Sequence, residues 1–158
     1  SSSNYKTLTA EGFYTEERNT SAIYSGNSAS MYAKVGLMYP SDYGYATVGG
    51  TTLTNKSSCR AKELYNWDSS SYSDCKNNDW LFTSQSSFVN SGEWLLSPYS
   101  SGSKRAAYLG SSGSVGFGFS GSVSLSQFAV RPTFYLDSSI LKIVGTGDGT
   151  KDNAYRVG

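Results

Sequence analysis

The chain has 158 residues, enough for one domain with a substantial hydrophobic core, and 15% of them are aromatic, which excludes an intrinsically disordered chain. Its net charge is +1 and only 16% of residues are charged, with lysines and arginines scattered, so neither a nucleic-acid partner nor direct contact with an anionic membrane is expected. The chain contains no histidine, which removes the Ser–His and Cys–His pairs of nucleophilic catalysis.

The N-terminal part predicts little regular structure before one short strand. Residues 1–34 are polar and irregular, with a compact cluster at residues 13–18, and residues 34–39 predict a buried strand that Pro40 stops. No apolar run approaches the ~18 residues of a membrane span, and no signal peptide is present. We therefore expect one extracellular domain over residues 1–158, whose N-terminal targeting or anchoring segment has been removed.

Two short helices are expected next. Ser41 reads as the N-cap of a helix that runs to Thr47, because a serine hydroxyl accepts hydrogen bonds from first-turn amides. Ser58 in the same way predicts the start of a helix that ends at Trp67. The polar stretch at residues 68–78 then reads as a loop.

The two cysteines, Cys59 and Cys75, are 16 positions apart, which fits neither a redox CxxC motif nor a zinc pair. Either they form a disulfide, or they are two buried free thiols of an intracellular protein. A surface rich in Ser, Tyr and Gly and poor in Lys and Glu favours the disulfide and an extracellular location. A disulfide that closes a loop of this length stabilises the fold by roughly 3 kcal/mol in the chain-entropy model.

The second half predicts short strands joined by turns. Apolar runs bounded by turn residues lie at residues 80–82, 93–96 and 106–109. From Val115 to Leu125, apolar residues alternate with Gly and Ser, which is the period of strands with one apolar face. Residues 130–136 predict a strand that starts at an edge or a bulge, because Pro132 donates no hydrogen bond. The last predicted strands are residues 141–144 and 154–157.

Motifs for cofactors and metals are weak. Residues 116–121 match GxGxxG, but they lie within the alternating pattern and no helix follows, so a nucleotide site is not expected. Residues 147–153 lack the residue order and the distal glutamate of a calcium loop and read as a hairpin turn. The aspartates of residues 68–79 fit no standard ligand set. We expect no cofactor, no metal and no catalytic residues.

Aromatic residues beside Ser and Gly stretches are the best candidates for a binding surface, since Tyr with Ser and Gly gives contact area at low entropic cost. The candidate contact residues are Tyr99, Arg105, Tyr108, Phe117 and Phe119. Arg105 can fork onto a carboxylate or stack on an aromatic ring. For the two phenylalanines, the alternative is a covered sheet face with tyrosine hydroxyls at its rim. The tryptophans are expected in the core: Trp67, Trp80 and Trp94.

Several short sequence segments, in a fixed order over residues 10–158, resemble segments of one protein family. They are residues 34–47, 66–67, 75–81, 94–98, 106–108, 113–115, 130–132 and 146–150, with Tyr155. This pattern is similar to C-type-lectin-like domains of surface and type IV pilin-like proteins of Gram-positive gut bacteria. The resemblance implies a fold related in shape to formylglycine-generating enzymes and to the variable proteins of diversity-generating retroelements.

Two departures from those relatives limit what the resemblance implies. The calcium-binding triplets Glu-Pro-Asn and Gln-Pro-Asp are absent, so calcium-mediated sugar binding is not expected. Cys59 and Cys75 do not match the reactive cysteine pair of formylglycine-generating enzymes. In retroelement-diversified relatives the variable residues precede the last core strands, which by resemblance corresponds here to residues 99–127.

The fold class expected is α+β: a C-type-lectin-like domain with two short helices, a twisted antiparallel sheet and one disulfide. The function expected is that of a non-catalytic head domain on the bacterial cell surface, which binds a protein or glycan ligand through a loop-and-hairpin face. Two alternatives remain. One is a structural subunit of a type IV pilus-like filament, whose aromatic face packs on neighbouring pilin subunits. The other is an enzyme of formylglycine-generating-enzyme-like fold.

Overall fold

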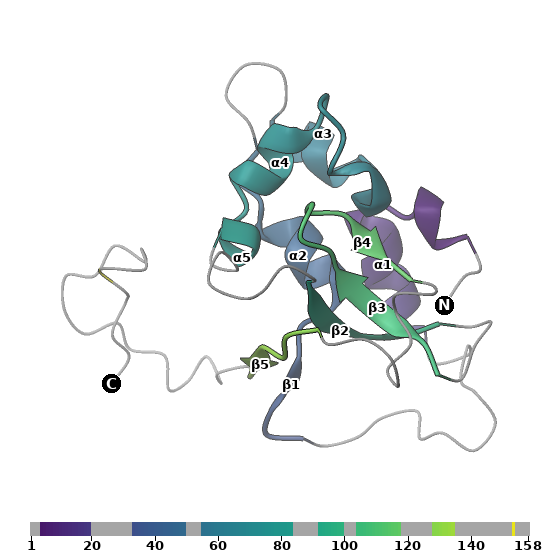
Figure 1. Ribbon diagram of the computed structural model, residues 1–158. Helices are drawn as coiled ribbons and strands as arrows, with labels where there is room; N and C mark the ends of the chain where they lie inside the picture. Colours follow the sequence, from purple (N-terminus) through teal and green to yellow (C-terminus); the bar gives the residue numbers. More distant parts are fainter. Residues whose placement is uncertain are drawn as a thin grey trace, which may run out of the picture.

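The computed structural model describes residues 4–19, 33–49, 55–83, 92–99, 104–117, 128–134 and Asn153, and within these ranges the chain is mixed helix and antiparallel sheet (Figure 1). The helical elements are η1 (Tyr5–Thr7), α1 (Ala10–Glu17), α2 (Pro40–Ala46), α3 (Lys56–Arg60), η3 (Leu64–Asn66), α4 (Ser73–Asn77) and α5 (Trp80–Thr83). The strands are β1 (Gly36–Leu37), β2 (Glu93–Pro98), β3 (Ala106–Leu109), β4 (Val115–Gly116) and β5 (Pro132–Thr133). In Figure 1, α3 and α4 lie at one end of the molecule and the β1–β5 pair at the other. This bears out the α+β prediction in its coarse form.

The N-terminal segment is more regular than its sequence indicates. Residues 10–17 form α1, where an irregular chain was predicted, and Thr9 caps the helix by accepting a hydrogen bond from the amide of Gly12. Only Ala10 and Phe13 are buried on this helix. Two buried positions in eight residues leave too weak an apolar stripe for the periodicity to reveal the helix.

Helix α2 begins two residues earlier than predicted. Pro40 occupies the first helical position and Tyr39 is the N-cap, while the carboxylate of Asp42 accepts the Tyr39 amide at 2.8 Å. Proline is favoured at this position because its fixed φ suits the helix and the amide it lacks has no partner there. Ser41, predicted as the cap, is a buried residue of the first turn and hydrogen-bonds to Glu17 of α1.

The predicted second helix is wrong in its extent. It divides into α3 and η3, and α3 is capped by Asn55, which accepts the Ser58 amide at 2.9 Å. The predicted loop at residues 68–78 contains α4. The run 80–82, predicted as a strand, is the helix α5. Short apolar runs do not distinguish a strand from a helix, and here the Asp79 carboxylate decides by accepting the amides of Leu81 and Phe82.

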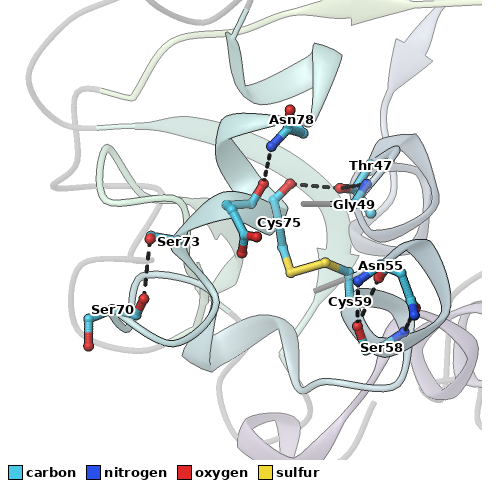
Figure 2. Close-up of a disulfide and its surroundings, with 10 residues drawn as sticks. Thr47, Gly49, Asn55, Ser58, Cys59, Ser70, Ser73, Cys75 and Asn78 are labelled. Carbon is cyan, nitrogen blue, oxygen red and sulfur yellow. Dashed lines mark hydrogen bonds between the residues drawn. A yellow bond between two sulfur atoms is a disulfide. The ribbon is translucent and has the colours of Figure 1, made fainter. Parts of the chain in front are cut away.

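The disulfide between Cys59 and Cys75 is confirmed. The two Cα atoms are 5.6 Å apart, both side chains are fully buried, and the bond joins α3 to α4 (Figure 2). The hydroxyl of Thr47 donates to the Cys75 carbonyl at 2.7 Å and accepts the Gly49 amide at 3.0 Å. The chain after α2 is therefore tied to α4 next to the disulfide.

Two antiparallel sheets form the rest of the described fold. In the first, β3 lies between β2 and β4, with Trp94 opposite Tyr108 and Tyr108 opposite Gly116. The second pairs β1 with β5. Strands predicted at residues 93–96 and 106–109 are confirmed. β1 is shorter than predicted and half-buried, because its neighbour β5 is a short edge strand with an exposed Pro132.

Three sequence predictions fall outside the described residues. They are the continuation of the alternating pattern beyond Phe117, the end of the strand predicted to reach Leu136, and the predicted strands 141–144 and 154–157. Among the helices described, none is both long and apolar enough to span a bilayer.

The core lies between the helices and the inner face of the larger sheet. Its largest fully buried side chains are Trp67 and Tyr43, whose ring centroids are 5.0 Å apart. The Tyr43 hydroxyl donates to the carbonyl of Gly113 at 2.8 Å, so α2 is joined directly to the β3–β4 turn. The disulfide packs in the same cluster and holds the helices that cover these two rings.

Removing the disulfide should destabilise the fold. We expect the double substitution Cys59→Ala with Cys75→Ala to lower the free energy of unfolding by about 2–4 kcal/mol, since an uncrosslinked chain has more unfolded conformations. Urea denaturation of both proteins measures this difference, and reductant should shift only the wild-type midpoint. Equal midpoints for wild type with and without reductant would contradict a stabilising role for the bond.

Candidate functional site

A buried ion pair organises the part of the fold that carries the predicted contact residues. Nη2 of Arg131 lies 2.7 Å from Oε2 of Glu93, and Nη1 donates to the Leu81 carbonyl at 2.9 Å. Glu93 is fully buried at the start of β2. The pair holds residues 128–134 against that strand, where Ala129 exchanges hydrogen bonds with Gly92 and Trp94. Phe128 is placed over the sheet as a result.

A second carboxylate, Asp79, is also fully buried. One oxygen caps α5, while Oδ2 has no hydrogen-bond partner among the described residues. Burial raises the pKa of Asp79 to about 7, against the lowering effect of the Phe82 and Leu81 amides and of Arg131. Asp79 and Glu93 thus serve the fold: one caps a helix and the other holds an arginine. In the part of the chain that the structure describes, no three metal-ligating side chains cluster together.

The pleat of the larger sheet divides its aromatic residues between two faces. Odd-numbered positions such as Leu95, Leu109 and Val115 point to the core and are buried. Even-numbered positions form the outer face, where Phe128 contacts both Trp94 and Tyr108 with ring centroids 4.8 and 4.9 Å apart. We call Trp94, Tyr108 and Phe128 the outer-face cluster.

Tyr108 lies across a glycine of the next strand. A Cβ atom on Gly116 would be 2.5 Å from the terminal ring carbon and the hydroxyl oxygen of Tyr108. The absence of a side chain at Gly116 therefore lets the Tyr108 ring lie flat over β4, toward the edge of the sheet.

At that edge, three tyrosines from distant parts of the sequence form a row of ring contacts. Tyr5 is central: its ring centroid is 5.8 Å from that of Tyr65 and 6.1 Å from that of Tyr99, both edge to face. A cation lies at each end of the row. Lys6 Nζ is 4.9 Å from the Tyr65 centroid, and Arg105 Cζ is 5.9 Å from the Tyr99 centroid. We call Tyr5, Tyr65 and Tyr99 the tyrosine row.

The tyrosine row is held in place by the core beneath it. The Tyr5 hydroxyl donates to the Phe117 carbonyl at 3.1 Å, and the Phe117 ring lies 5.0 Å from Tyr5 and 5.6 Å from Tyr99. Burial raises the pKa of Tyr5; Lys6 opposes the rise, and Tyr65, Tyr108 and Tyr99 add to it. The hydroxyl is therefore neutral at physiological pH, while all three rings of the row remain half-exposed.

The structure brings some of the predicted contact residues together and separates others. Tyr99 and Arg105 lie together at one end of the tyrosine row. Tyr108 belongs to the outer-face cluster. Phe117 is 4% exposed and packs beneath the row, which is the covered alternative that the sequence left open. Phe119 lies outside the described residues.

Sequence reasoning missed three members of this surface. Tyr5 and Lys6 belong to a segment predicted to be irregular, and Tyr65 was assigned to a helix. Nothing local marks these residues, since their shared position depends on η1 and η3 meeting the sheet edge. Among the tryptophans, Trp67 is in the core as predicted and Trp94 is half-buried. Trp80 is 64% exposed, which corrects its assignment to the core, because α5 turns it outward.

Comparison of the chain with protein-family models, with curated proteins and with solved structures gives no match.

The buried Asp79 should make stability depend on pH. Its folded-state pKa, about 7, exceeds its ordinary value of roughly 3.9, so the folded protein holds a proton that the unfolded chain has lost between these values. The free energy of unfolding should then fall as pH rises from about 4 to 7. Glu17, whose pKa burial also raises to about 7, acts in the same direction.

We expect Asp79→Asn to flatten this dependence in part, because the amide cannot ionise while Glu17 still does. Urea midpoints at pH 5 and pH 8 measure the effect, and Asp68→Asn at an exposed carboxylate is the control. An Asp79→Asn protein with the wild-type pH slope would contradict the assignment.

The packing of Tyr108 over Gly116 should be sensitive to one methyl group. Gly116→Ala is expected to displace the ring and cost about 1–3 kcal/mol, as overpacked sites do. Because Phe128 links Tyr108 to Trp94, tryptophan fluorescence should change as well. Gly110→Ala is the control, since a Cβ there would meet no atom closer than 3.5 Å. Equal fluorescence and stability in both variants would contradict the close contact.

Proposed function

We propose that this chain is a non-catalytic, extracellular head domain of a bacterial cell-surface or pilin-like protein, and that it binds a protein or glycan ligand through the tyrosine row. The single observation that carries the proposal is the row itself: three half-buried rings, the central Tyr5 in contact with both others, with a cation near the ring at each end.

The rings of the tyrosine row are preorganised for binding. Tyrosine offers a large amphipathic surface with few rotatable bonds, so little entropy is lost when it contacts a ligand. Here Phe117 and the Tyr5 hydrogen bond hold the rings before any ligand arrives. A surface that is already ordered spends less of its interaction energy on ordering side chains.

Other observations support the proposed extracellular location, fold and non-catalytic role. A buried disulfide suits an oxidising compartment outside the cytosol. Small helices beside short antiparallel strands agree with the C-type-lectin-like fold that the sequence resembles. The absence of histidine from the sequence, with Glu93 committed to Arg131 and Asp79 to the cap of α5, favours binding over catalysis.

One observation favours the alternative of a structural filament subunit. Val35 and Phe134 flank the last pair of the β1–β5 ladder, Gly36 opposite Thr133, and are 56% and 66% exposed. An exposed apolar pair beside a short strand ladder is suited to packing on a neighbouring copy. In that case Phe134→Ser should abolish self-association while changes in the tyrosine row leave it intact.

A screen against glycan and protein arrays tests the proposed function. We expect the wild-type domain to bind a ligand, and Tyr65→Ala or Tyr99→Ala to weaken that binding about tenfold or more, since a buried interface tyrosine contributes at least ~1.4 kcal/mol. Tyr45→Ala is the matched control: this tyrosine is also exposed and lies under a cation, Arg60, at 4.7 Å, but it lies outside the row.

Two results would overturn the proposal. One is the absence of any ligand on both arrays. The other is a ligand whose affinity falls equally in the Tyr45→Ala control and in the two variants of the tyrosine row. Thermal melts of all variants establish that each remains folded at the temperature of the screen.

A further inference from the structure

The charges around the tyrosine row narrow the kind of ligand. Resting on the proposed function, we infer that the row binds an acidic polysaccharide, with carboxylate groups of the polymer at Lys6 and Arg105 and its sugar rings against the tyrosines.

The charged residues beside the tyrosine row are mostly cations. The segments that form the row carry Lys6 on η1 and, just before β3, Lys104 and Arg105; Lys6 and Lys104 are exposed. The described carboxylates of these elements and their caps are both paired with cations: Glu63 Oε2 lies 3.0 Å from Lys62 Nζ, and the buried Glu93 at the start of β2 is paired with Arg131. The tyrosine hydroxyl of Tyr5 is neutral. This edge is therefore positive on a chain whose net charge is only +1.

Lys6 and Arg105 lie close to the rings at the two ends of the row. Each is held near a ring, so each has a restricted position before the ligand binds. The ion pairs within the described ranges use Arg18, Lys62 and Arg131, and none of them uses Lys6. An arginine presents two parallel donors that match a carboxylate, and a lysine adds a point charge.

The ring angles and phenol groups of the row favour a polysaccharide over other anionic polymers. Successive bases of a single-stranded nucleic acid need ring faces on which to stack, but adjacent rings of the row meet at 75° and 80°. A peptide ligand depends on apolar anchors in pockets, whereas this row presents phenol groups. Phenol hydroxyls both donate and accept, which suits the hydroxyls of a sugar chain.

Calorimetric titration with defined polymers tests the inference. The probes are polygalacturonate, its fully methyl-esterified form, hyaluronan and neutral dextran, each in 50 and 300 mM NaCl. We expect polygalacturonate, hyaluronan or both to bind. If polygalacturonate binds, its methyl ester should bind at least ~10-fold more weakly. Affinity for the carboxylated polymer should fall at the higher salt concentration, because exposed charges are screened.

Single substitutions identify the groups that read the charge. Lys6→Gln and Arg105→Gln should each lower affinity for the carboxylated polymer about five- to tenfold, and Arg105→Lys should lower it less than Arg105→Gln because it keeps the charge. Lys56→Gln, at an exposed lysine of α3 outside the row, is the matched control and should bind as wild type does.

The outcomes separate this inference from the proposed function. Equal binding of neutral and carboxylated polymers would overturn the acidic ligand and leave glycan binding standing. Equal or tighter binding of a poly-glutamate peptide or of single-stranded RNA would overturn the polysaccharide. Failure of both carboxylated polymers to bind, with a protein ligand found on the array, would overturn the inference alone. Absence of every ligand would overturn both.

Discussion

The buried pair of Glu93 and Arg131 is the constraint on which the second half of the described fold depends. One guanidinium group contacts the carboxylate that opens β2 and the Leu81 carbonyl of α5, and its own segment continues into β5. Three elements that are distant in sequence therefore meet at one side chain. Because a buried charge is costly without its partner, removing either member is expected to cost about 3–5 kcal/mol, far more than an exposed pair. The position of Phe128 on the outer face follows from this pair.

The alternation of side chains along the sheet has a functional consequence. Residues of β2 and β3 that point away from the core, Trp94 and Tyr108, belong to the outer-face cluster, whereas the tyrosine row is formed by η1, η3 and the residue after β2. The Tyr108 ring, lying over Gly116 of the edge strand β4, brings its hydroxyl end toward the sheet edge. Residues of both groups are thus close to one edge, although only the row has cations at its ends.

The core and the candidate surface are continuous through Phe117. Its ring touches Phe13 of α1, with centroids 6.2 Å apart, as well as two members of the tyrosine row. Its carbonyl also receives the Tyr5 hydroxyl. A residue predicted to contact a ligand therefore supports the residues that are proposed to do so. The disulfide acts on the other side of the same core, where it holds the helices that pack around Trp67.

The sequence alone determined the features that depend on a local pattern of residues or, as for the disulfide, on a pairing with only one possible partner. Two cysteines can pair in one way, and apolar runs between turn residues located β2 and β3. The sequence could not determine α1, whose apolar stripe has only two buried residues, nor α4 and α5, which are too short for a helical period; the caps Thr9 and Asp79 fix α1 and α5. Nor could it determine the tyrosine row, because Tyr5, Tyr65 and Tyr99 come from three separate segments. Only tertiary packing against Phe117 places their rings in contact, and a pattern along the chain contains no information about that distance.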